Sequence, residues 1–226
     1  MRGLFNSISH IIFDLDGLLV DSEPLWKLAE QKTLAEYGKV WQIEIARQHI
    51  GVRIDQVAEI MVHGYQVDSS PEVFGNRLME HMFELIASDL QVMSGAVEAI
   101  QKFHAAGLTL AIASSSSETY IRAIVEQMNW TDFISIIASA CNVPQGKPSP
   151  DVYLDAVRML GTDSTTCLAF EDSVNGAKAA HAARIRVCAI PGHDFHPADF
   201  DGIANVVYPS LNDVLHLEFG ANLPIE

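Results

Sequence analysis

Short apolar runs separated by stretches of helical periodicity organise most of this chain. The first run, residues 8–13, is rich in isoleucine and ends at Asp14. Continuous apolar character over so few residues favours a strand that is buried on both faces. Four similar runs follow, at residues 108–113, 134–138, 167–170 and 186–190. Because helical patterns separate the later runs, the alternation predicts a parallel sheet with helices on both faces.

Residues 21–92 interrupt this alternation, because they show helical periodicity and no convincing strand. Apolar positions recur at helical spacing from Trp26 to Tyr37, with Ser22 available to cap the start and Gly38 to end the helix. Further helical patterns run through residues 54–61 and 73–86. The chain therefore predicts an α/β fold, a doubly wound, Rossmann-like parallel sheet interrupted after its first strand by a helical insertion.

Two carboxylates stand directly after the first predicted strand, at Asp14 and Asp16, and Gly17 follows them. The carboxyl ends of parallel strands border the ligand crevice of such a sheet, so both acids are expected there. Carboxylates two residues apart can share a divalent cation, or one can attack while the other transfers protons. A lone Asp in this place is more often a turn or helix cap, but the pair followed by Gly17 favours a functional site.

Serines and a lysine extend this polar edge. A run of four serines begins at Ser114, before a helical pattern, where the hydroxyls and free N–H groups of Ser114 and Ser115 can bind a phosphate. Ordinary N-capping would need only one of these serines. Lys147 lies in a loop that Pro148 and Pro150 stiffen, and such a lysine can neutralise phosphate oxygens. A solvated surface lysine is the usual alternative.

Glu171 and Asp172 again place acids directly after an apolar strand. With Asp14 and the backbone oxygen of Asp16, Asp172 would complete an oxygen-rich site suited to Mg²⁺, which needs few carboxylates and keeps several waters. Helix capping by Asp172 or Ser173 is the alternative, and it is compatible with the metal role.

Composition narrows the class of function. The formal net charge is -15 and the isoelectric point is near 4.8, so the long-range field opposes binding to nucleic acid or anionic membrane. Cys141, Cys167 and Cys188 form no C-x-x-C pair, which favours buried, reduced thiols over a disulfide framework or zinc site. No signal peptide or long apolar run is evident. We expect a cytoplasmic protein, and the high charge and single core favour a monomer.

The polar clusters together resemble the motifs of a known family. The Asp-x-Asp-Gly segment that starts at Asp14, then Ser114, Lys147 and the pair Glu171-Asp172 are similar, in this order, to the four motifs of the haloacid dehalogenase superfamily. The match spans nearly the whole chain.

Longer segments that begin at Phe13, Gly51 and Phe170 are similar to one subgroup of that superfamily. It contains hexitol phosphatases, 2-deoxyglucose-6-phosphate phosphatases and β-phosphoglucomutases. The resemblance implies a catalytic core and a mobile α-helical cap, with hinges near residues 18–20 and 91–95. The implied core comprises residues 1–20 and 93–226, and the implied cap comprises residues 21–92.

The resemblance implies a magnesium-dependent phosphatase that acts on a small sugar or sugar-alcohol phosphate. Asp14 would attack phosphorus to form an aspartyl-phosphate, and Asp16 would protonate the leaving alcohol and then activate water. Mg²⁺, Lys147 and the serines would offset charge on the phosphoryl oxygens. The implied metal ligands are Asp14, Asp16 through its backbone oxygen, and Asp172, with Glu171 binding the ion or orienting its waters.

Three cap residues are candidate substrate contacts, because closure of a cap brings its residues onto the leaving group. Arg53 is preferred from its place in Gly-Val-Arg-Ile, with an exposed, unpaired arginine as an equal alternative. Glu23 can hydrogen-bond a sugar hydroxyl or favour the helix start. Trp26 stands where β-phosphoglucomutases carry a histidine, which favours a phosphatase over a mutase. Its ring can stack on substrate or pack the cap helix.

A phosphosugar mutase of the β-phosphoglucomutase type remains the main alternative. A metal-free haloacid dehalogenase would have no use for Asp16 or Asp172. A non-enzymatic, phospho-accepting receiver domain would carry no long helical insertion. These features place the phosphatase first.

Overall fold

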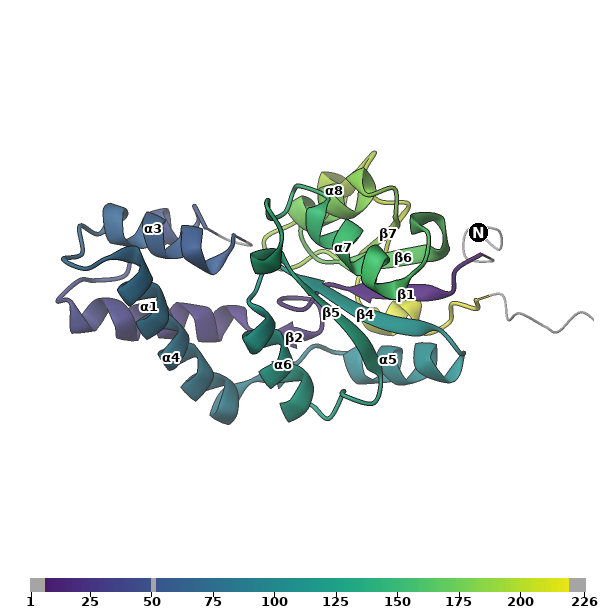
Figure 1. The fold of residues 1–226 in the computed structure, drawn as a ribbon, viewed down its shortest axis with the longest axis horizontal. Coiled ribbons are helices and arrows are strands. Elements are labelled where there is room, and N and C mark those ends of the chain that lie inside the picture. Colours follow the sequence, from purple (N-terminus) through teal and green to yellow (C-terminus); the bar gives the residue numbers. More distant parts are fainter. Residues whose placement is uncertain (1–6, 50–51, 220–226) are drawn as a thin grey trace, which may run out of the picture.

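A six-stranded parallel sheet lies at the centre of the core (Figure 1). The computed structural model describes residues 7–49 and 52–219. The strand order is β5-β4-β1-β6-β7-β8, so the first strand of the chain is internal, as its apolar sequence predicts. The strands are β1 His10–Phe13, β4 Thr109–Ser114, β5 Ile134–Ser139, β6 Cys167–Glu171, β7 Arg186–Ala189 and β8 Val206–Val207.

Helices cover both faces of this sheet (Figure 1). Helices α5 (Ala96–Ala105) and α6 (Glu118–Gln127) pack on one face, and α7 (Asp151–Leu160) and α8 (Val174–Ala182) pack on the other. The predicted α/β, doubly wound fold is therefore confirmed. Short 3-10 helices complete the core: η1 Ala140–Asn142, η2 Ser164–Thr166, η3 Pro197–Phe200 and η4 Leu211–Val214.

The two faces of β1 belong to different parts of the hydrophobic core, because successive side chains of a strand point in opposite directions. Phe13 stacks on Phe103 of α5 and Phe170 of β6, with ring centroids 6.2 and 5.4 Å away. Ile12 faces the other way and belongs to a fully buried cluster with Tyr153 of α7 and Ala177 of α8. Burial on both sides fixes the end of β1, where the candidate acids begin.

Within the described residues the insertion contains four helices. It stands beyond one edge of the sheet (Figure 1). The two longest of these helices, α1 (Glu23–Glu36) and α4 (Pro71–Asp89), pack side by side, with Ala29, Phe74 and Leu78 among their buried side chains. Gly51, which begins the Gly-Val-Arg-Ile segment, lies outside the described residues, as do residues 1–6 and 220–226 of the implied core. The helices are α1 Glu23–Glu36, α2 Ile43–Ala46, α3 Ile54–Gly64 and α4 Pro71–Asp89.

A small second sheet joins the insertion to the core. Strand β2 (Val20–Asp21) pairs antiparallel with β3 (Gln91–Val92), and the Met93 N–H donates to the Leu19 carbonyl at 2.9 Å. These strands were not predicted, because two residues are too few to show an alternating pattern. The two chain crossings are therefore hydrogen-bonded to each other.

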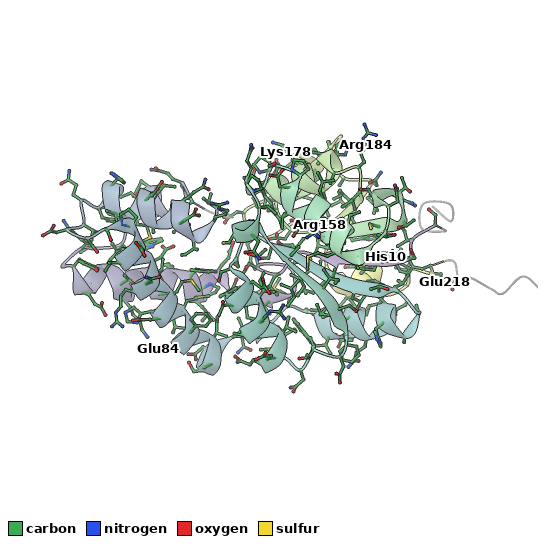
Figure 2. The ribbon with its side chains drawn as sticks, viewed as in Figure 1. His10, Glu84, Arg158, Lys178, Arg184 and Glu218 are labelled. Atoms are coloured by element: carbon green, nitrogen blue, oxygen red, sulfur yellow. The ribbon has the colours of Figure 1, made fainter. Side chains whose placement is uncertain are left out.

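Charged side chains project from several helices of the surface. Glu84 projects from α4, Lys178 from α8 and Arg184 from the turn after α8 (Figure 2). Cys167 and Cys188 are buried as expected, but Cys141 is exposed, because it lies in η1 at the end of β5 rather than inside a strand. Within residues 7–49 and 52–219, no helix combines the length and apolar character needed to span a membrane.

Candidate functional site

Strand register brings the predicted acids to one edge of the sheet. Phe13 lies beside Ile112 of β4 and Phe170 of β6, so the next residues along the three strands are also neighbours. The Asp14 N–H donates to the Phe170 carbonyl at 3.0 Å, which extends the ladder by one residue. Asp14 is therefore held between the ends of β4 and β6, next to Glu171.

Lys147 connects these strand ends. Its ammonium donates to Asp14 Oδ1 at 2.5 Å, to Glu171 Oε1 at 2.6 Å and to the Ala113 carbonyl at 3.0 Å. Its side chain is only 3% exposed. Three acceptors match the three N–H donors of an ammonium group, so this buried charge is fully paired.

Glu171 is the most enclosed acid of the group. It is fully buried, and its Oε1 also accepts a hydrogen bond from the Tyr153 hydroxyl at 2.5 Å, while the Ser173 hydroxyl lies 3.4 Å from Oε2. A Cβ at Gly176 of α8 would come within 2.1 Å of this carboxylate, so only glycine permits the approach. These contacts make Glu171 a fixed anchor for Lys147.

Asp172 lies against two glycines. A Cβ on Gly17 would fall 2.3 Å from Asp172 Oδ2, and one on Gly192 would fall 2.9 Å from the same atom. Gly17 also has a φ of +83°, which disfavours other residues. The glycine after the two acids therefore leaves space for a third acid, a contact that the segment alone does not reveal.

Asp14, Glu171 and Asp172 can together hold a metal ion. Each offers a carboxylate oxygen, and these atoms lie within 4.8 Å of one another. An all-oxygen donor set with few carboxylates and room for water fits Mg²⁺. The side chain of Asp16 lies outside this group, and the part expected of its backbone oxygen stays a prediction.

Crowding of these acids changes their proton affinities. Burial raises the pKa of Asp14 to about 8, an effect that the ammonium of Lys147 opposes and Glu171 reinforces. Burial and the Asp14 carboxylate raise the pKa of Asp172 well above its ordinary value. Burial alone would lower the pKa of Lys147, but its two carboxylate partners raise it overall. One lysine thus stands among three acids, a balance that favours a further cation.

Hydroxyl groups surround Asp16. Ser22 and Tyr120 donate to its Oδ1, each at 2.6 Å, and Ser116 donates to its Oδ2 at 2.8 Å. The Ser114 hydroxyl is more distant from Oδ2, at 3.4 Å. Ser22 was predicted to cap α1 through its side chain, but it makes no such cap. Its hydroxyl donates to Asp16 instead. The hydroxyl groups of Ser22, Ser116 and Tyr120 hold the Asp16 side chain in one orientation.

A cavity of about 500 Å³ opens between this edge and the helical insertion. Eight of the ten predicted site residues line it. They are Asp14, Asp16, Glu23, Trp26, Ser114, Ser115, Lys147 and Asp172. The described structure thus places the predicted phosphate-binding residues and catalytic acids on one surface, facing the insertion.

The other two predicted residues lie beside the cavity. Glu171 sits behind Asp14, with no exposed surface. Arg53 pairs with Asp55, its Nη2 lying 2.5 Å from Oδ2, and its Nη1 donates to the Ala140 and Val143 carbonyls of the core, each at 3.2 Å. In this structure Arg53 therefore connects the insertion to the core.

Several residues of the site were not predicted. Tyr120 lies among the buried positions of α6, where a tyrosine resembles an ordinary core residue, and Trp26 packs against its ring at 5.6 Å. Tyr153 is hidden in the same way in α7. Glu30, Trp41 and His49 line the part of the cavity formed by the insertion. No local spacing signals these residues, because helix packing brings them together.

Sequence comparison relates this chain to known phosphatases and to one hydrolase family. The family model described as haloacid dehalogenase-like hydrolase matches residues 11–190. Hexitol phosphatase B of Escherichia coli (strain K12) is 34% identical over 210 residues, covering 90% of this chain and 92% of that protein. A probable pseudouridine-5'-phosphatase of Drosophila melanogaster is 31% identical over 196 residues, covering 83% of this chain and 84% of that protein.

A solved structure shares the whole architecture. The crystal structure of CbbY from Rhodobacter sphaeroides in complex with phosphate superposes with a TM-score of 0.84 at 26% identity, covering 92% of this chain and 96% of that one. The predicted resemblance to the superfamily, and to its subgroup with hexitol phosphatases, is confirmed. The chain belongs to the haloacid dehalogenase-like hydrolase family.

Proposed function

We propose that this protein is a magnesium-dependent phosphatase that hydrolyses a small sugar or sugar-alcohol phosphate through an aspartyl-phosphate on Asp14. The observation that carries the proposal is the cluster of Asp14, Lys147, Glu171 and Asp172, which faces a cavity closed on its other side by the helical insertion. Nucleophile, cation and metal-binding oxygens converge there, as phosphoryl transfer requires.

Asp14 is the proposed nucleophile. Its Oδ1 is held by Lys147, which leaves Oδ2 to attack phosphorus with displacement of the alcohol. The bond from phosphorus to the leaving oxygen breaks as the acyl phosphate forms, and water then cleaves the acyl phosphate to release phosphate. Splitting hydrolysis in this way replaces one difficult step with two easier ones.

Asp16 is the proposed acid and base. It must supply a proton to the leaving alcohol and later remove one from the attacking water. The hydroxyls of Ser22, Ser116 and Tyr120 can serve either state, because a hydroxyl group can donate to a carboxylate or accept from a carboxylic acid. The network therefore positions Asp16 through the whole cycle.

Magnesium is proposed because the cavity is acidic. Six carboxylate side chains line it, against the side chains of Lys27, Arg47 and Lys147 as the permanent cations among the described lining residues. A phosphate dianion needs further positive charge to enter such a site. When bound by Asp14, Asp172 and the backbone oxygen of Asp16, Mg²⁺ would offset charge on the phosphoryl oxygens. The carboxylates are those of Asp14, Asp16, Glu23, Glu30, Asp172 and Asp194.

The relatives and the cavity support the proposed substrate class. Similarity over most of both chains to a hexitol phosphatase favours a polyol or sugar phosphate. A volume of about 500 Å³ lies in the range typical of small-molecule sites, and Trp26 and Trp41 offer apolar faces beside polar groups. We place the protein in the cytoplasm, as a monomer.

The test is phosphate release from hexose, hexitol, glycerol and nucleoside monophosphates, measured with Mg²⁺ and after removal of metal by a chelator. Release that depends on Mg²⁺ and is highest for hexose or hexitol phosphates supports the proposal. Sugar-phosphate isomers are followed in the same samples. Interconversion of isomers without release would instead establish a mutase.

A further inference from the structure

The insertion contains a buried polar group of its own, formed by Glu30, Trp41 and His49. Trp41 Nε1 donates to Glu30 Oε2 at 2.6 Å, and His49 Nδ1 lies 3.7 Å from Glu30 Oε1. Glu30 is 5% exposed and His49 is 7% exposed. The residues come from α1, from the loop before α2 and from the segment after it, so only the folded insertion assembles them. We call this group the cap triad.

The cap triad lines the same cavity as Asp14 and Lys147. Lys27 lies over Trp41, with its ammonium 5.0 Å from the ring centroid. The indole N–H of Trp41 donates a hydrogen bond to one carboxylate oxygen of Glu30. The other carboxylate oxygen of Glu30 lies 3.7 Å from His49 Nδ1, and both residues line the cavity.

Hydrogen-bonding capacity is left open in the cap triad. His49 Nε2 is buried and has no hydrogen-bond partner among the described residues, and Glu30 Oε1 has only the distant His49 nitrogen. A buried polar atom without a partner destabilises the folded protein, so a fold retains one most readily where a ligand supplies the partner. Burial also lowers the pKa of His49, which keeps the ring neutral and able to donate from one nitrogen and accept at the other.

We propose that the cap triad is the specificity site for the leaving group, and that Glu30 and His49 hydrogen-bond a hydroxyl of the sugar or polyol. This inference rests on the proposed phosphatase function and deepens it. A carboxylate and a neutral imidazole beside an indole ring match a hydroxylated carbon chain, which presents O–H groups to the polar atoms and C–H groups to the ring.

A site built to bind a hydroxyl discriminates strongly against a leaving group without one, because its buried polar atoms then remain unpaired. The cap triad would thus separate polyol phosphates from other phosphate esters, while the core performs the same chemistry on all of them. Substrate choice and phosphoryl transfer would reside in different residues of one cavity.

The experiment compares kcat/KM for two kinds of ester. Glycerol 3-phosphate, glucose 6-phosphate and sorbitol 6-phosphate have hydroxylated leaving groups, whereas p-nitrophenyl phosphate has none. Glu30→Leu, Glu30→Gln and His49→Gln are tested with Mg²⁺, beside Glu44→Gln and His63→Gln, which change exposed residues of the insertion outside the cavity. Thermal unfolding of every variant reports on folding, and Glu30→Gln keeps an acceptor for Trp41 if Glu30→Leu fails to fold.

For the preferred hydroxylated ester, kcat/KM should fall about 10- to 100-fold in Glu30→Leu and His49→Gln, the loss expected for one strong hydrogen bond. For p-nitrophenyl phosphate it should stay within about threefold, and the two control variants should match the wild type for both esters. Equal losses for both kinds of ester, or no loss for either, would overturn the inference and leave the phosphatase intact. If the wild type hydrolysed p-nitrophenyl phosphate but none of the hydroxylated esters, the inference would also be overturned and the phosphatase would stand. If it hydrolysed no ester at all, the proposed function itself would be wrong.

Discussion

The two polar regions of the cavity differ in how completely their atoms are paired. At the core edge, Lys147 satisfies Asp14 and Glu171 together, and three hydroxyls enclose Asp16. In the insertion, the cap triad leaves His49 Nε2 without a partner among the described residues. The first region is organised before substrate arrives, and the second is completed by it.

This difference suggests a division of labour. Groups that stabilise a transferring phosphoryl group act best when they are already fixed, since no reorganisation is then needed during the reaction. Groups that select a substrate act by being unpaired without it. The four predictions below test the two sides of this comparison.

The largest effect is expected at Asp14. Asp14→Asn removes the nucleophile but keeps a similar shape, so turnover should fall by about 10⁵-fold or more, as for other nucleophile substitutions. Phosphate release from the best substrate measures this loss. Substantial turnover by a folded Asp14→Asn variant would contradict the role given to Asp14.

Loss of the central cation should destabilise the protein. Lys147→Met leaves Asp14 and Glu171 buried without their partner, at a cost of about 3–5 kcal/mol in the free energy of unfolding. Urea unfolding in the presence of a chelator measures it. Lys178→Met, on the exposed face of α8 (Figure 2), is the matched control and should change the free energy by less than about 0.5 kcal/mol.

The cap triad should make stability depend on pH. Burial raises the pKa of Glu30 from 4.5 to about 7, so between these values the folded chain keeps a proton that the unfolded chain releases. Binding of this proton therefore contributes to the free energy of unfolding at low pH, and the contribution is lost as the pH rises through about 7. Between about pH 5 and about pH 8, the wild type should lose about 2–3 kcal/mol of unfolding free energy relative to Glu30→Gln. A constant difference between the two proteins would contradict the assigned burial of Glu30.

The smallest effect concerns a positioning residue. Tyr120→Phe removes one hydroxyl from Asp16 without changing the packing of the ring against Trp26, and kcat should fall about tenfold with little change in KM. Steady-state kinetics on the best substrate separates the two parameters. Tyr37→Phe, whose hydroxyl bonds only weakly to Ser69 in the insertion, should behave as the wild type. An unchanged kcat in Tyr120→Phe would show that Ser22 and Ser116 suffice.

Much of the core site could be predicted from the sequence, because parallel strands end at one edge and bring together whatever follows them. Asp14, Ser114 and Asp172 are separated widely in the chain, yet each follows a short apolar run. Lys147 could be predicted because Pro148 and Pro150 stiffen the loop that carries it. In each case a local pattern specified both the position and the polar group.

The remaining parts depend on packing between elements. The hydroxyl of Tyr120 reaches Asp16 only because α6 lies against the sheet, and its place in an apolar stripe predicts no more than burial. Glu30 and His49 meet through the arrangement of α1 and α2, which single-helix periodicity does not determine. Arg53 shows the same dependence, since its contacts with core carbonyls come from the seating of the insertion on the core.

The position of the phosphoryl group on the protein is the most direct test of Asp14 as the nucleophile. Asp16→Asn should accept phosphate faster than it releases it, because the residue that activates water is lost while the nucleophile remains. The variant is mixed with Mg²⁺ and a labelled hexitol phosphate, quenched in acid and digested, and the labelled peptide is identified by mass spectrometry. We expect the label on the peptide that contains Asp14. Label on another residue, or phosphate release with no labelled protein at any time, would rule out Asp14 as the nucleophile.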